Sequence, residues 1–326
     1  MDLVLYVTNK CNLNCTYCFV NKSNEVMKMK TYIDAFNKYK EKIDTTTFFG
    51  GEPLLYTKLI SQIIEYNKSN GYYYNYVINT NGIGINDNLI SLCKNNNILI
   101  NVSLDGCLKS NIKNRFEEEK FKLVEKNIKM LKDNKIKFVI NYVITPNNIE
   151  YIEESLWYFV QNCFMEVCLM INYDALWSEK DITLMKQQFE KSIPVMLKMV
   201  KNNFIRLSPI YNKINCIING IPEVKCNFGK EVIVIDCDGK KYPCMSFVGN
   251  KNYEIVDDKQ DFINTCDVKK CKNCEYLNLC NNNCMCRNCN INKDSKIDVN
   301  CECEKIFIEI AKKIVDKISN HQLYDN

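Results

Sequence analysis

Short apolar runs that alternate with helical repeats dominate the first part of the chain. Six of these runs are rich in Val, Ile, Phe and Tyr and predict β-strands. They lie at Leu3–Thr8, Thr46–Phe49, Tyr74–Asn79, Leu99–Leu104, Lys137–Val143 and Glu166–Ile171. Because helical segments separate the runs, we expect a parallel sheet built from right-handed βαβ units.

Helical periodicity fills the intervals between these strands. The predicted helices are Thr31–Ile43, Lys58–Ser69, Asn86–Cys93, Phe116–Lys132, Ile149–Val160 and, after the last strand, Ile182–Lys201. Gly71 is expected to end the second helix, and Asn86 and Asn148 to cap the starts of later ones. Six strand–helix units are enough for a partial α/β barrel but fewer than the eight of a complete one.

The texture of the chain changes near residue 206, and from Cys226 onward Cys, Asn, Lys and Gly dominate. Val232–Cys237 and Lys241–Tyr242 flank Asp238-Gly239, which predicts a hairpin with a two-residue turn. The stretch from Cys266 to Cys303 is too polar to build its own hydrophobic core, so its Cys residues are expected to staple it.

An amphipathic helix is predicted after Cys303. Its apolar stripe consists of Ile306, Phe307, Ile310, Ile314 and Ile318. We therefore expect a partial barrel over 1–205, a bridging segment over 206–225, and a small Cys-rich domain of loops and a hairpin over 226–326 that ends in this helix.

Charge and hydropathy exclude several classes of partner. The chain has 43 Lys and Arg against 39 Asp and Glu, and a net charge of +4 does not suggest a dedicated nucleic-acid surface. No apolar run approaches the length of about 18 residues that indicates a membrane span, and the N-terminal run is too short for a signal peptide. We expect a cytoplasmic protein without nucleic-acid or membrane partners.

The chain contains 20 Cys and a single His, His321, which is expected to lie in a solvated tail. Clustered thiols in a chain without an export signal favour metal ligands or catalytic groups over disulfides. Zinc fingers with paired His, three-His zinc enzymes and Ser-His-Asp triads are nearly excluded. Thiolates must hold any metal.

Three cysteines, Cys11, Cys15 and Cys18, follow the first predicted strand in a C-x3-C-x2-C run. Such a loop can wrap three thiolates around three corners of an iron–sulfur cube. The next cysteine, Cys93, lies far along the chain, so one iron would stay open. Structural zinc prefers four closed ligands, and three-ligand catalytic zinc usually recruits His or a carboxylate. The run therefore favours a cluster that binds a small molecule at its open iron.

This loop resembles the signature of the radical SAM superfamily, C-x3-C-x-aromatic-C, with Tyr17 at the aromatic position. The second strand ends in Gly50-Gly51-Glu52-Pro53, which is similar to the family's GGEP motif. Two glycines let backbone carbonyls approach a ligand closely. The resemblance implies that this motif binds SAM and that Glu52 faces the ammonium group of its methionine.

Polar residues end the third and fourth predicted strands, at the carboxyl edge where α/β proteins bind ligands. They are Asn79 in Asn-Thr-Asn-Gly and Ser103 in Ser-Leu-Asp-Gly. The resemblance implies that both contribute polar groups to the ribose and methionine of SAM. Asp105 is expected either to join them or to brace the turn before Gly106.

The C-terminal cysteines are similar to the SPASM pattern, C-x9–15-G-x4-C, then C-x2-C-x5-C-x3-C and a last Cys. The resemblance implies two auxiliary 4Fe–4S clusters with interleaved ligands. The first would use Cys226, Cys244 and Cys284, with Cys237 as a candidate fourth ligand. The second would use Cys271, Cys274, Cys280 and either Cys301 or Cys303, with Cys303 preferred because the terminal helix is expected to begin beside it. Cys286 and Cys289 exceed the pattern.

The resemblance implies a radical SAM barrel with three 4Fe–4S clusters and SAM as cofactors. An electron from a donor such as ferredoxin or flavodoxin would cleave SAM to a 5′-deoxyadenosyl radical, which takes a hydrogen from the substrate. The radical SAM/SPASM group mostly modifies peptides and proteins. Our leading hypothesis is therefore oxidative maturation of a ribosomal peptide, for example by a thioether crosslink. The first strand starts at Leu3, so leader recognition is expected to fall to a separate protein or to the barrel surface.

Other functions stay open on the same residues. Formylglycine formation in sulfatases is one, and a small-molecule radical dehydrogenase is another. A non-enzymatic iron–sulfur or zinc scaffold would account for the C-terminal cysteines. It would leave the GGEP motif and the strand-end motifs unexplained.

Overall fold

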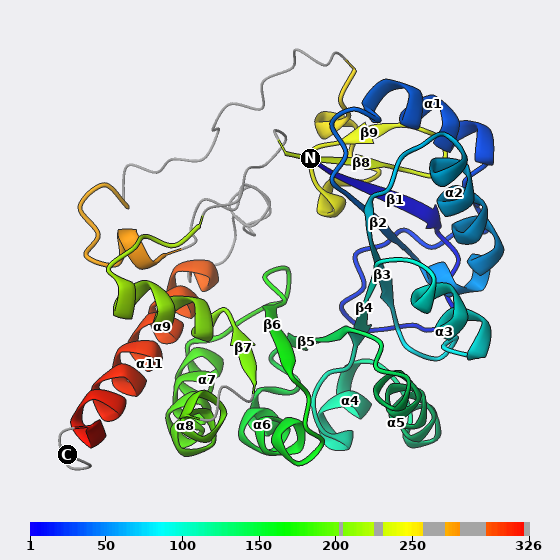
Figure 1. The fold of residues 1–326 in the computed structure, drawn as a ribbon. Helices are drawn as coiled ribbons and strands as arrows, with labels where there is room; N and C mark the ends of the chain where they lie inside the picture. Colours follow the sequence, from blue (N-terminus) through cyan, green and yellow to red (C-terminus); the bar gives the residue numbers. More distant parts are fainter. Residues whose placement is uncertain (202–204, 225–230, 257–270, 281–297, 323–326) are drawn as a thin grey trace. The chain divides into compact units, whose positions relative to one another are not determined.

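The computed structural model describes residues 1–201, 205–224, 231–256, 271–280 and 298–322. Strands β1 to β6 alternate with helices along the chain (Figure 1), which confirms the predicted α/β class and the strand–helix repeat of a partial (β/α)6 barrel. The chain divides into two compact units. The first comprises Met1–Ser103, Phe116–Phe138 and Asn227–Ile263, and the second comprises Leu104–Arg115, Val139–Cys226 and Asn264–Asn326.

The first unit contains strands in the order β4-β3-β2-β1-β8-β9. These strands are β1 (Asp2–Thr8), β2 (Thr45–Gly50), β3 (Asn75–Thr80), β4 (Ile98–Ser103), β8 (Val232–Ile235) and β9 (Lys241–Tyr242). Its helices are α1 (Met29–Tyr39), α2 (Thr57–Ser69), α3 (Asp87–Lys94) and α5 (Glu118–Asp133), with 3-10 turns η1 (Pro53–Tyr56), η3 (Met245–Phe247) and η4 (Lys251–Tyr253).

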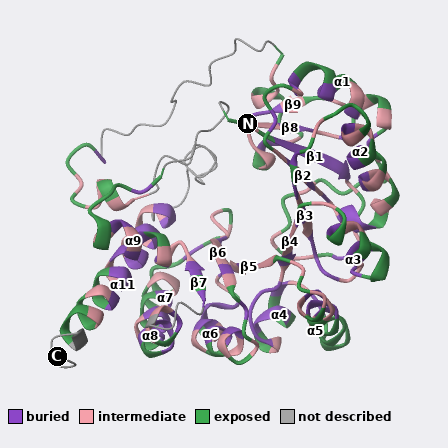
Figure 2. Ribbon diagram, viewed as in Figure 1, coloured by how far each residue is buried: buried purple, intermediate pink, exposed green. Residues whose placement is uncertain are grey.

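Alternate side chains of β2, β3 and β4 are fully buried, and those between them are half-buried or exposed (Figure 2). The buried set packs against helices. Tyr32 of α1 donates to Asn67 of α2, which donates to the hydroxyl of Tyr76 on β3 at 3.1 Å. Tyr76 in turn stacks on Phe48 of β2, with ring centroids 6.0 Å apart. One face of the sheet is therefore closed by helices, and ligand-binding polar residues are left to the other face and the strand ends.

The hairpin β8–β9 extends this sheet, because β8 pairs in parallel with β1 from Asp2↔Val232 to Leu5↔Ile235. The predicted hairpin is confirmed, but its two-residue turn is wrong. Five residues, 236 to 240, separate the strands, and the Asp236 N–H donates to the Lys240 carbonyl at 3.0 Å. The Asp236 carboxylate also accepts the N–H groups of Asp238 and Lys240, which favours the longer loop.

The second unit contains three parallel strands, β5 (Phe138–Ile144), β6 (Glu166–Ile171) and β7 (Arg206–Ser208). Its helices are α4 (Leu108–Asn114), α6 (Ile152–Gln161), α7 (Glu179–Lys191), α8 (Ile193–Lys201), α9 (Ile210–Asn219) and α11 (Val299–Gln322), with η2 (Ile149–Tyr151) and η6 (Leu277–Leu279). No described helix has the length and apolar character that crossing a membrane requires.

Two helices differ from their predictions. The single helix expected over Ile182–Lys201 is two helices, α7 and α8, separated at Ser192. Pro194 explains the break, because proline has no N–H for a helix interior and disfavours helical backbone in the residue before it. The terminal helix α11 begins at Val299, before both Cys301 and Cys303, and not after Cys303 as expected.

The predicted helix ends are partly confirmed. Asn86 caps α3, accepting the N–H of Leu89 at 3.1 Å, and Gly71 follows α2 with φ +82°. Asn148 precedes η2 but does not cap it. Its side chain accepts the N–H of Thr145 at 2.8 Å and closes the preceding turn instead.

Candidate active site

The loop between β1 and α1 carries the first three candidate ligands. Cys11 and Cys15 are half-buried and Cys18 is exposed. The N–H of Cys18 donates to the carbonyl of Cys15 at 3.2 Å, and the N–H of Leu13 points to the Cys11 sulfur at 3.4 Å. Burial raises the pKa of the Cys11 thiol, while the Leu13 N–H and the charge of Lys22 oppose that rise. The three thiols thus share one short, accessible loop.

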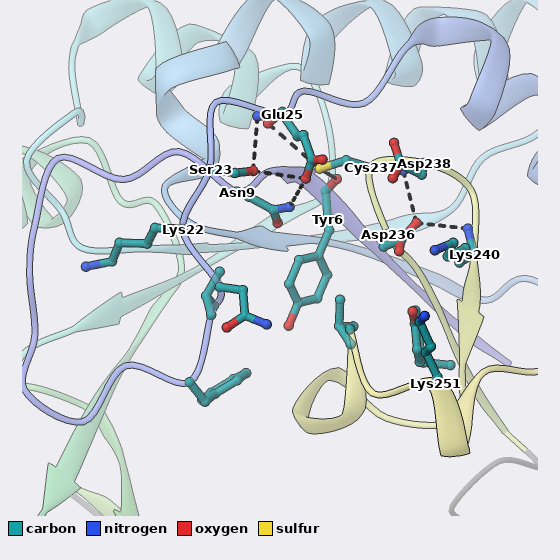
Figure 3. Close-up of a pocket in the computed structure, with 16 residues that line it drawn as sticks. Tyr6, Asn9, Lys22, Ser23, Glu25, Asp236, Cys237, Asp238, Lys240 and Lys251 are labelled. Carbon is teal, nitrogen blue, oxygen red and sulfur yellow. Dashed lines mark hydrogen bonds between the residues drawn. The ribbon is translucent and has the colours of Figure 1, made fainter.

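Polar side chains fix the base of this loop (Figure 3). Glu25 accepts the side-chain amide of Asn9 at 2.8 Å and the hydroxyl of Ser23 at 2.9 Å, and its carbonyl accepts the Asn9 N–H at 3.0 Å. Lys22 reaches back to the Leu13 carbonyl at 2.7 Å. The sequence analysis did not single out these residues, because nothing in their spacing marks them. They hold the loop while its thiols remain accessible.

The glycines of the GGEP motif bring the end of β2 against the residues that precede Cys11. The Gly51 N–H donates to the Thr8 carbonyl at 2.7 Å, and the Glu52 N–H donates to the Lys10 carbonyl at 2.8 Å. A Cβ at Gly50, whose φ is +124°, or at Gly51 would lie 2.2 Å from one of these carbonyl oxygens. The close approach that needs glycine is therefore, within the protein, an approach to the cysteine loop.

Glu52 joins this motif to the end of β3. It is 1 % exposed. Its carboxylate accepts the N–H of Leu54 at 3.0 Å, the hydroxyl of Thr80 at 2.8 Å and the N–H of Asn81 at 2.8 Å. Asn81 also donates to Asn12, between Cys11 and Cys15, at 2.7 Å. The GGEP motif, the Asn-Thr-Asn-Gly turn and the cysteine loop are therefore linked by hydrogen bonds.

Glu52→Gln is expected to lower the free energy of unfolding by about 1–3 kcal/mol, because an amide nitrogen would then face a buried donor that a carboxylate oxygen accepts. Urea denaturation measures the change. The matched control is Glu118→Gln, which removes one partner of the exposed pair with Lys122 and should cost less than about 0.5 kcal/mol. Equal effects of the two substitutions would contradict the bracing role of Glu52.

The remaining SAM-binding candidates lie in the first unit at the predicted strand ends. Tyr17 is half-buried in the cysteine loop, and the buried Pro53 begins η1. Asn79 accepts the side-chain amide of its register neighbour Asn101 at 3.1 Å. Ser103 is half-buried at the end of β4, and its hydroxyl has no partner among the described residues. Their roles toward SAM stay predictions.

Asp105 has the bracing role that was one of its two expected alternatives. Its buried carboxylate accepts the N–H of Val143 at 3.0 Å and lies 3.5 Å from the guanidinium of Arg115. Its own N–H donates to the side chain of Asn111 at 2.9 Å. These bonds hold the turn that contains Gly106, whose φ is +81°.

The candidates for the first auxiliary cluster are only partly within the described residues, because Cys226 and Cys284 lie outside them. Cys244 is half-buried at the start of η3. Cys237 is 5 % exposed and its thiol donates to the Tyr6 carbonyl at 3.2 Å. Burial raises the pKa of Cys237 to about 12. Whether Cys237 completes a cluster stays a prediction.

Tyr6 on β1 lies beside cysteines of both predicted sets. Its hydroxyl donates to the Met245 carbonyl at 2.8 Å. The pKa of Tyr6 is well above its usual value because of burial first, and then because of the nearby Cys244, Cys18 and Cys237. Tyr6 and Cys237 also line a cavity of about 280 Å³ between the cysteine loop and the β8–β9 hairpin (Figure 3). The hairpin that follows Cys226 thus adjoins the first cysteine loop.

The candidates for the second auxiliary cluster lie in the second unit. Cys271 is buried, and Cys274 and Cys280 are half-buried on consecutive tight turns. Cys303 on α11 is fully buried, whereas Cys301 is half-buried. Cys286 and Cys289 lie outside the described residues. Over the described ranges, no three Cys, His, Asp or Glu side chains converge closely enough to hold a single metal ion.

The other cysteines divide between core and surface. Cys93 is a core residue, as predicted, and Cys168 is half-buried on β6. Cys163 was expected in the core but is exposed, because it lies in the turn after α6 with φ +50°. Two residues assigned to loops are buried at helices: Cys107 precedes α4, and Cys216 lies within α9. Cys266 lies outside the described residues.

The donor set and the close-packed motifs fit an iron–sulfur cluster with bound SAM, and comparisons with known proteins agree. Residues 5–157 match the Radical SAM superfamily. The cysteine-type anaerobic sulfatase-maturating enzyme of Clostridium novyi is 27% identical over 363 residues, which cover 97% of this chain and 96% of the relative.

Solved structures show the same fold. The chain matches native anSMEcpe with bound AdoMet and Kp18Cys peptide with a TM-score of 0.75 and 22% identity, over 98% of this chain and 99% of the other. It also matches Streptococcus suis SuiB bound to precursor peptide SuiA, with a TM-score of 0.63 and 17% identity, over 87% of this chain and 72% of the other. The predicted radical SAM enzyme with a Cys-rich C-terminal SPASM region is confirmed, and the chain belongs to the radical SAM superfamily.

Proposed function

We propose that this enzyme oxidises a cysteine side chain of a peptide or protein substrate in a reaction that consumes SAM. The observation that carries the proposal is the resemblance to cysteine-type anaerobic sulfatase-maturating enzymes, which extends through the barrel and the Cys-rich region alike. A resemblance confined to the barrel would support SAM cleavage only. Its full length supports a shared substrate class.

In this proposal Cys11, Cys15 and Cys18 hold a 4Fe–4S cluster whose fourth iron binds SAM. Reductive cleavage of SAM at that cluster supplies a 5′-deoxyadenosyl radical. The protein's contribution is placement. Glu52 and Asn81 hold the strand ends against the cysteine loop, and these bonds fix the thiols relative to the SAM-binding motif. The half-buried Ser103 hydroxyl, which has no partner within the described ranges, is left as a donor for a ligand at the same strand edge.

We further propose two auxiliary clusters, and Cys301 as the last ligand of the second. Two features support Cys301 over Cys303. The helix begins before both residues, which removes the reason for preferring Cys303. Lys305 also has its pKa raised, first by its hydrogen bond with Glu302 and then in part by Cys301 and Cys274, so these two cysteines share a neighbour. Cys303 is 0 % exposed.

Cys301→Ser is expected to lower the iron content of the reconstituted protein by about four atoms per chain, which is one cluster. Cys303→Ser is the matched control two residues away on the same helix. It should keep the iron and lower the free energy of unfolding by about 1–3 kcal/mol, because its hydroxyl would be buried. Iron and sulfide analysis beside thermal unfolding measures both effects. Iron loss from the Cys303 variant alone would assign the ligand to Cys303.

The proposed reaction is tested with three peptides that differ only in carrying Cys, Ser or Ala at the target position. After anaerobic incubation with SAM and dithionite, we expect mass spectrometry to show conversion of the Cys side chain from –CH2SH to –CHO, with the Ala peptide unchanged. Formation of 5′-deoxyadenosine without change in any peptide would contradict a peptide substrate and favour a small-molecule dehydrogenase.

A crosslink in a ribosomal peptide is the second candidate, and the likeness in fold to SuiB with its precursor peptide favours it. The same assay separates the two, because a thioether crosslink removes two hydrogen atoms and leaves sulfur in the product. Such a substrate would bring a separate leader-binding protein as partner. Either reaction needs a one-electron donor, for which we propose a cytoplasmic ferredoxin or flavodoxin.

A further inference from the structure

Lys213 on α9 is a fully buried charge in the second unit. Its side chain is 0 % exposed. The ammonium group donates to the carbonyl of Leu279 at 2.8 Å and to the carboxylate of Glu304 at 2.8 Å, and a second carboxylate, that of Glu223, lies 3.8 Å away. Lysine is almost never fully buried unless it is paired. Three segments of the chain therefore supply the acceptors around one cation.

Two of these acceptors adjoin the candidate ligands of the second auxiliary cluster. Leu279 directly precedes Cys280. Glu304 lies three residues after Cys301 on α11, and residues at this spacing occupy the same side of a helix. Lys213 thus connects the backbone beside one candidate thiol to the helix turn that carries another.

Glu223 reinforces the same connection. Its backbone N–H donates to the carbonyl of Asn278 at 2.8 Å, one residue before the carbonyl that Lys213 holds. The pKa of Glu223 is raised first by burial, while the charge of Lys213 opposes the rise. Consecutive carbonyls of the Cys-bearing loop are therefore held by α9 and the segment after it.

Stability alone does not account for this arrangement. Taking a lysine and a carboxylate out of water costs free energy that their attraction often fails to recover, and apolar replacements of such pairs are frequently neutral or stabilising. A buried pair is better explained where it fixes one packing register among alternatives. The register at stake here is that of Leu279 and Cys280 against the first turns of α11.

We propose that Lys213 is a positioning residue for the second auxiliary cluster: it holds the loop at Cys280 against the helix turn of Cys301 so that the thiols of both segments can bind one cluster. The proposal rests on the proposed function, because that function supplies the cluster. Lys213 touches neither substrate nor cluster and acts through the Leu279 carbonyl and Glu304.

The test compares Lys213→Met, the double variant Lys213→Met/Glu304→Leu and the control Lys313→Met. The double variant removes both charges and keeps an apolar interior, so it is the variant expected to fold if the single one does not. The control removes the cation of the exposed Lys313–Glu190 pair from the same helix. Iron per chain, the electron paramagnetic resonance spectrum of the reduced clusters, uncoupled SAM cleavage and thermal unfolding are measured for each.

We expect the full chain to hold about twelve iron atoms and the double variant about eight, with one spectral component missing. Uncoupled SAM cleavage and the unfolding temperature should be retained, and the control should match the full chain. About twelve iron atoms in the double variant would overturn the proposal alone. Loss of all iron together with early unfolding would also overturn it, by showing a role in the whole fold. About four iron atoms in the unsubstituted chain would overturn both this proposal and the auxiliary clusters.

Discussion

Cys15→Ser is expected to remove about four iron atoms per chain and to abolish formation of 5′-deoxyadenosine from SAM. Serine offers a hard, protonated oxygen where an iron–sulfur cluster requires a soft thiolate. The loop cannot substitute another ligand, because the nearest described cysteine in sequence beyond Cys18 is Cys93, which is buried between α3 and the sheet. Iron analysis and chromatography of the SAM products measure both effects.

Cys163→Ser provides the control for that substitution. Cys163 is exposed in the turn after α6 and lies outside every predicted ligand set. Its serine variant should keep the iron content and the rate of SAM cleavage of the unsubstituted chain. Full SAM cleavage by the Cys15 variant would contradict the assignment of the loop. Equal losses in both variants would point to general damage from thiol removal.

Gly51→Ala has the second largest expected effect, on stability and on SAM binding together. The new Cβ would lie 2.2 Å from the Lys10 carbonyl oxygen, which is backbone and cannot rotate away. Overpacking of this kind costs about 1–3 kcal/mol or more. The displaced residue directly precedes Cys11, and its carbonyl accepts the Glu52 N–H, so the cysteine loop and the GGEP motif must shift together. Urea denaturation and calorimetric titration with SAM measure the two consequences.

Gly71→Ala separates steric contact from backbone strain. Gly71 has φ +82°, yet nothing lies within 4 Å of the Cβ that alanine would add. Its variant should lose about 1–2 kcal/mol through the left-handed backbone alone and bind SAM with unchanged affinity. Weakened SAM binding in the Gly71 variant, or unweakened binding in the Gly51 variant, would contradict the claim that the motif's packing on the cysteine loop shapes the site.

The strand–helix alternation of the barrel was predictable because it is written in local periodicity. The six strands lie within one or two residues of their predicted bounds. Elements without that signal were missed. The seven residues of α4 are mostly polar, and the buried face of α9 carries Lys213, which interrupts its apolar stripe. The helix break at Ser192 could have been found, because Pro194 marks it.

Contacts between distant residues could not be predicted from local patterns. The pairing of β8 with β1 brings a hairpin from the Cys-rich region into the sheet of the first unit. Nothing local in Val232–Ile235 specifies which edge it joins. The link from Asn81 to Asn12 and the packing of Gly51 on Lys10 are also long-range. The sequence marked these motifs but did not reveal that they brace one another.

The order of the C-terminal cysteines was informative, but spacing alone left the last ligand open. Two residues separate Cys301 from Cys303, so a pattern that requires a last Cys accepts either. The helix decides what each can reach, because residues two apart point to different sides of it. Cys303 faces the interior and Cys301 remains half-buried. Helix phase, which depends on where α11 begins, is the information the spacing lacks.

The most direct test of the account uses a peptide whose target cysteine carries deuterium at its β-carbon. Under anaerobic conditions with SAM and a reductant, the account predicts that deuterium appears in 5′-deoxyadenosine while the same cysteine is converted to the aldehyde. Transfer of the label would place the radical at the substrate carbon. Formation of unlabelled 5′-deoxyadenosine beside unchanged peptide would contradict the proposed oxidation of a peptide cysteine.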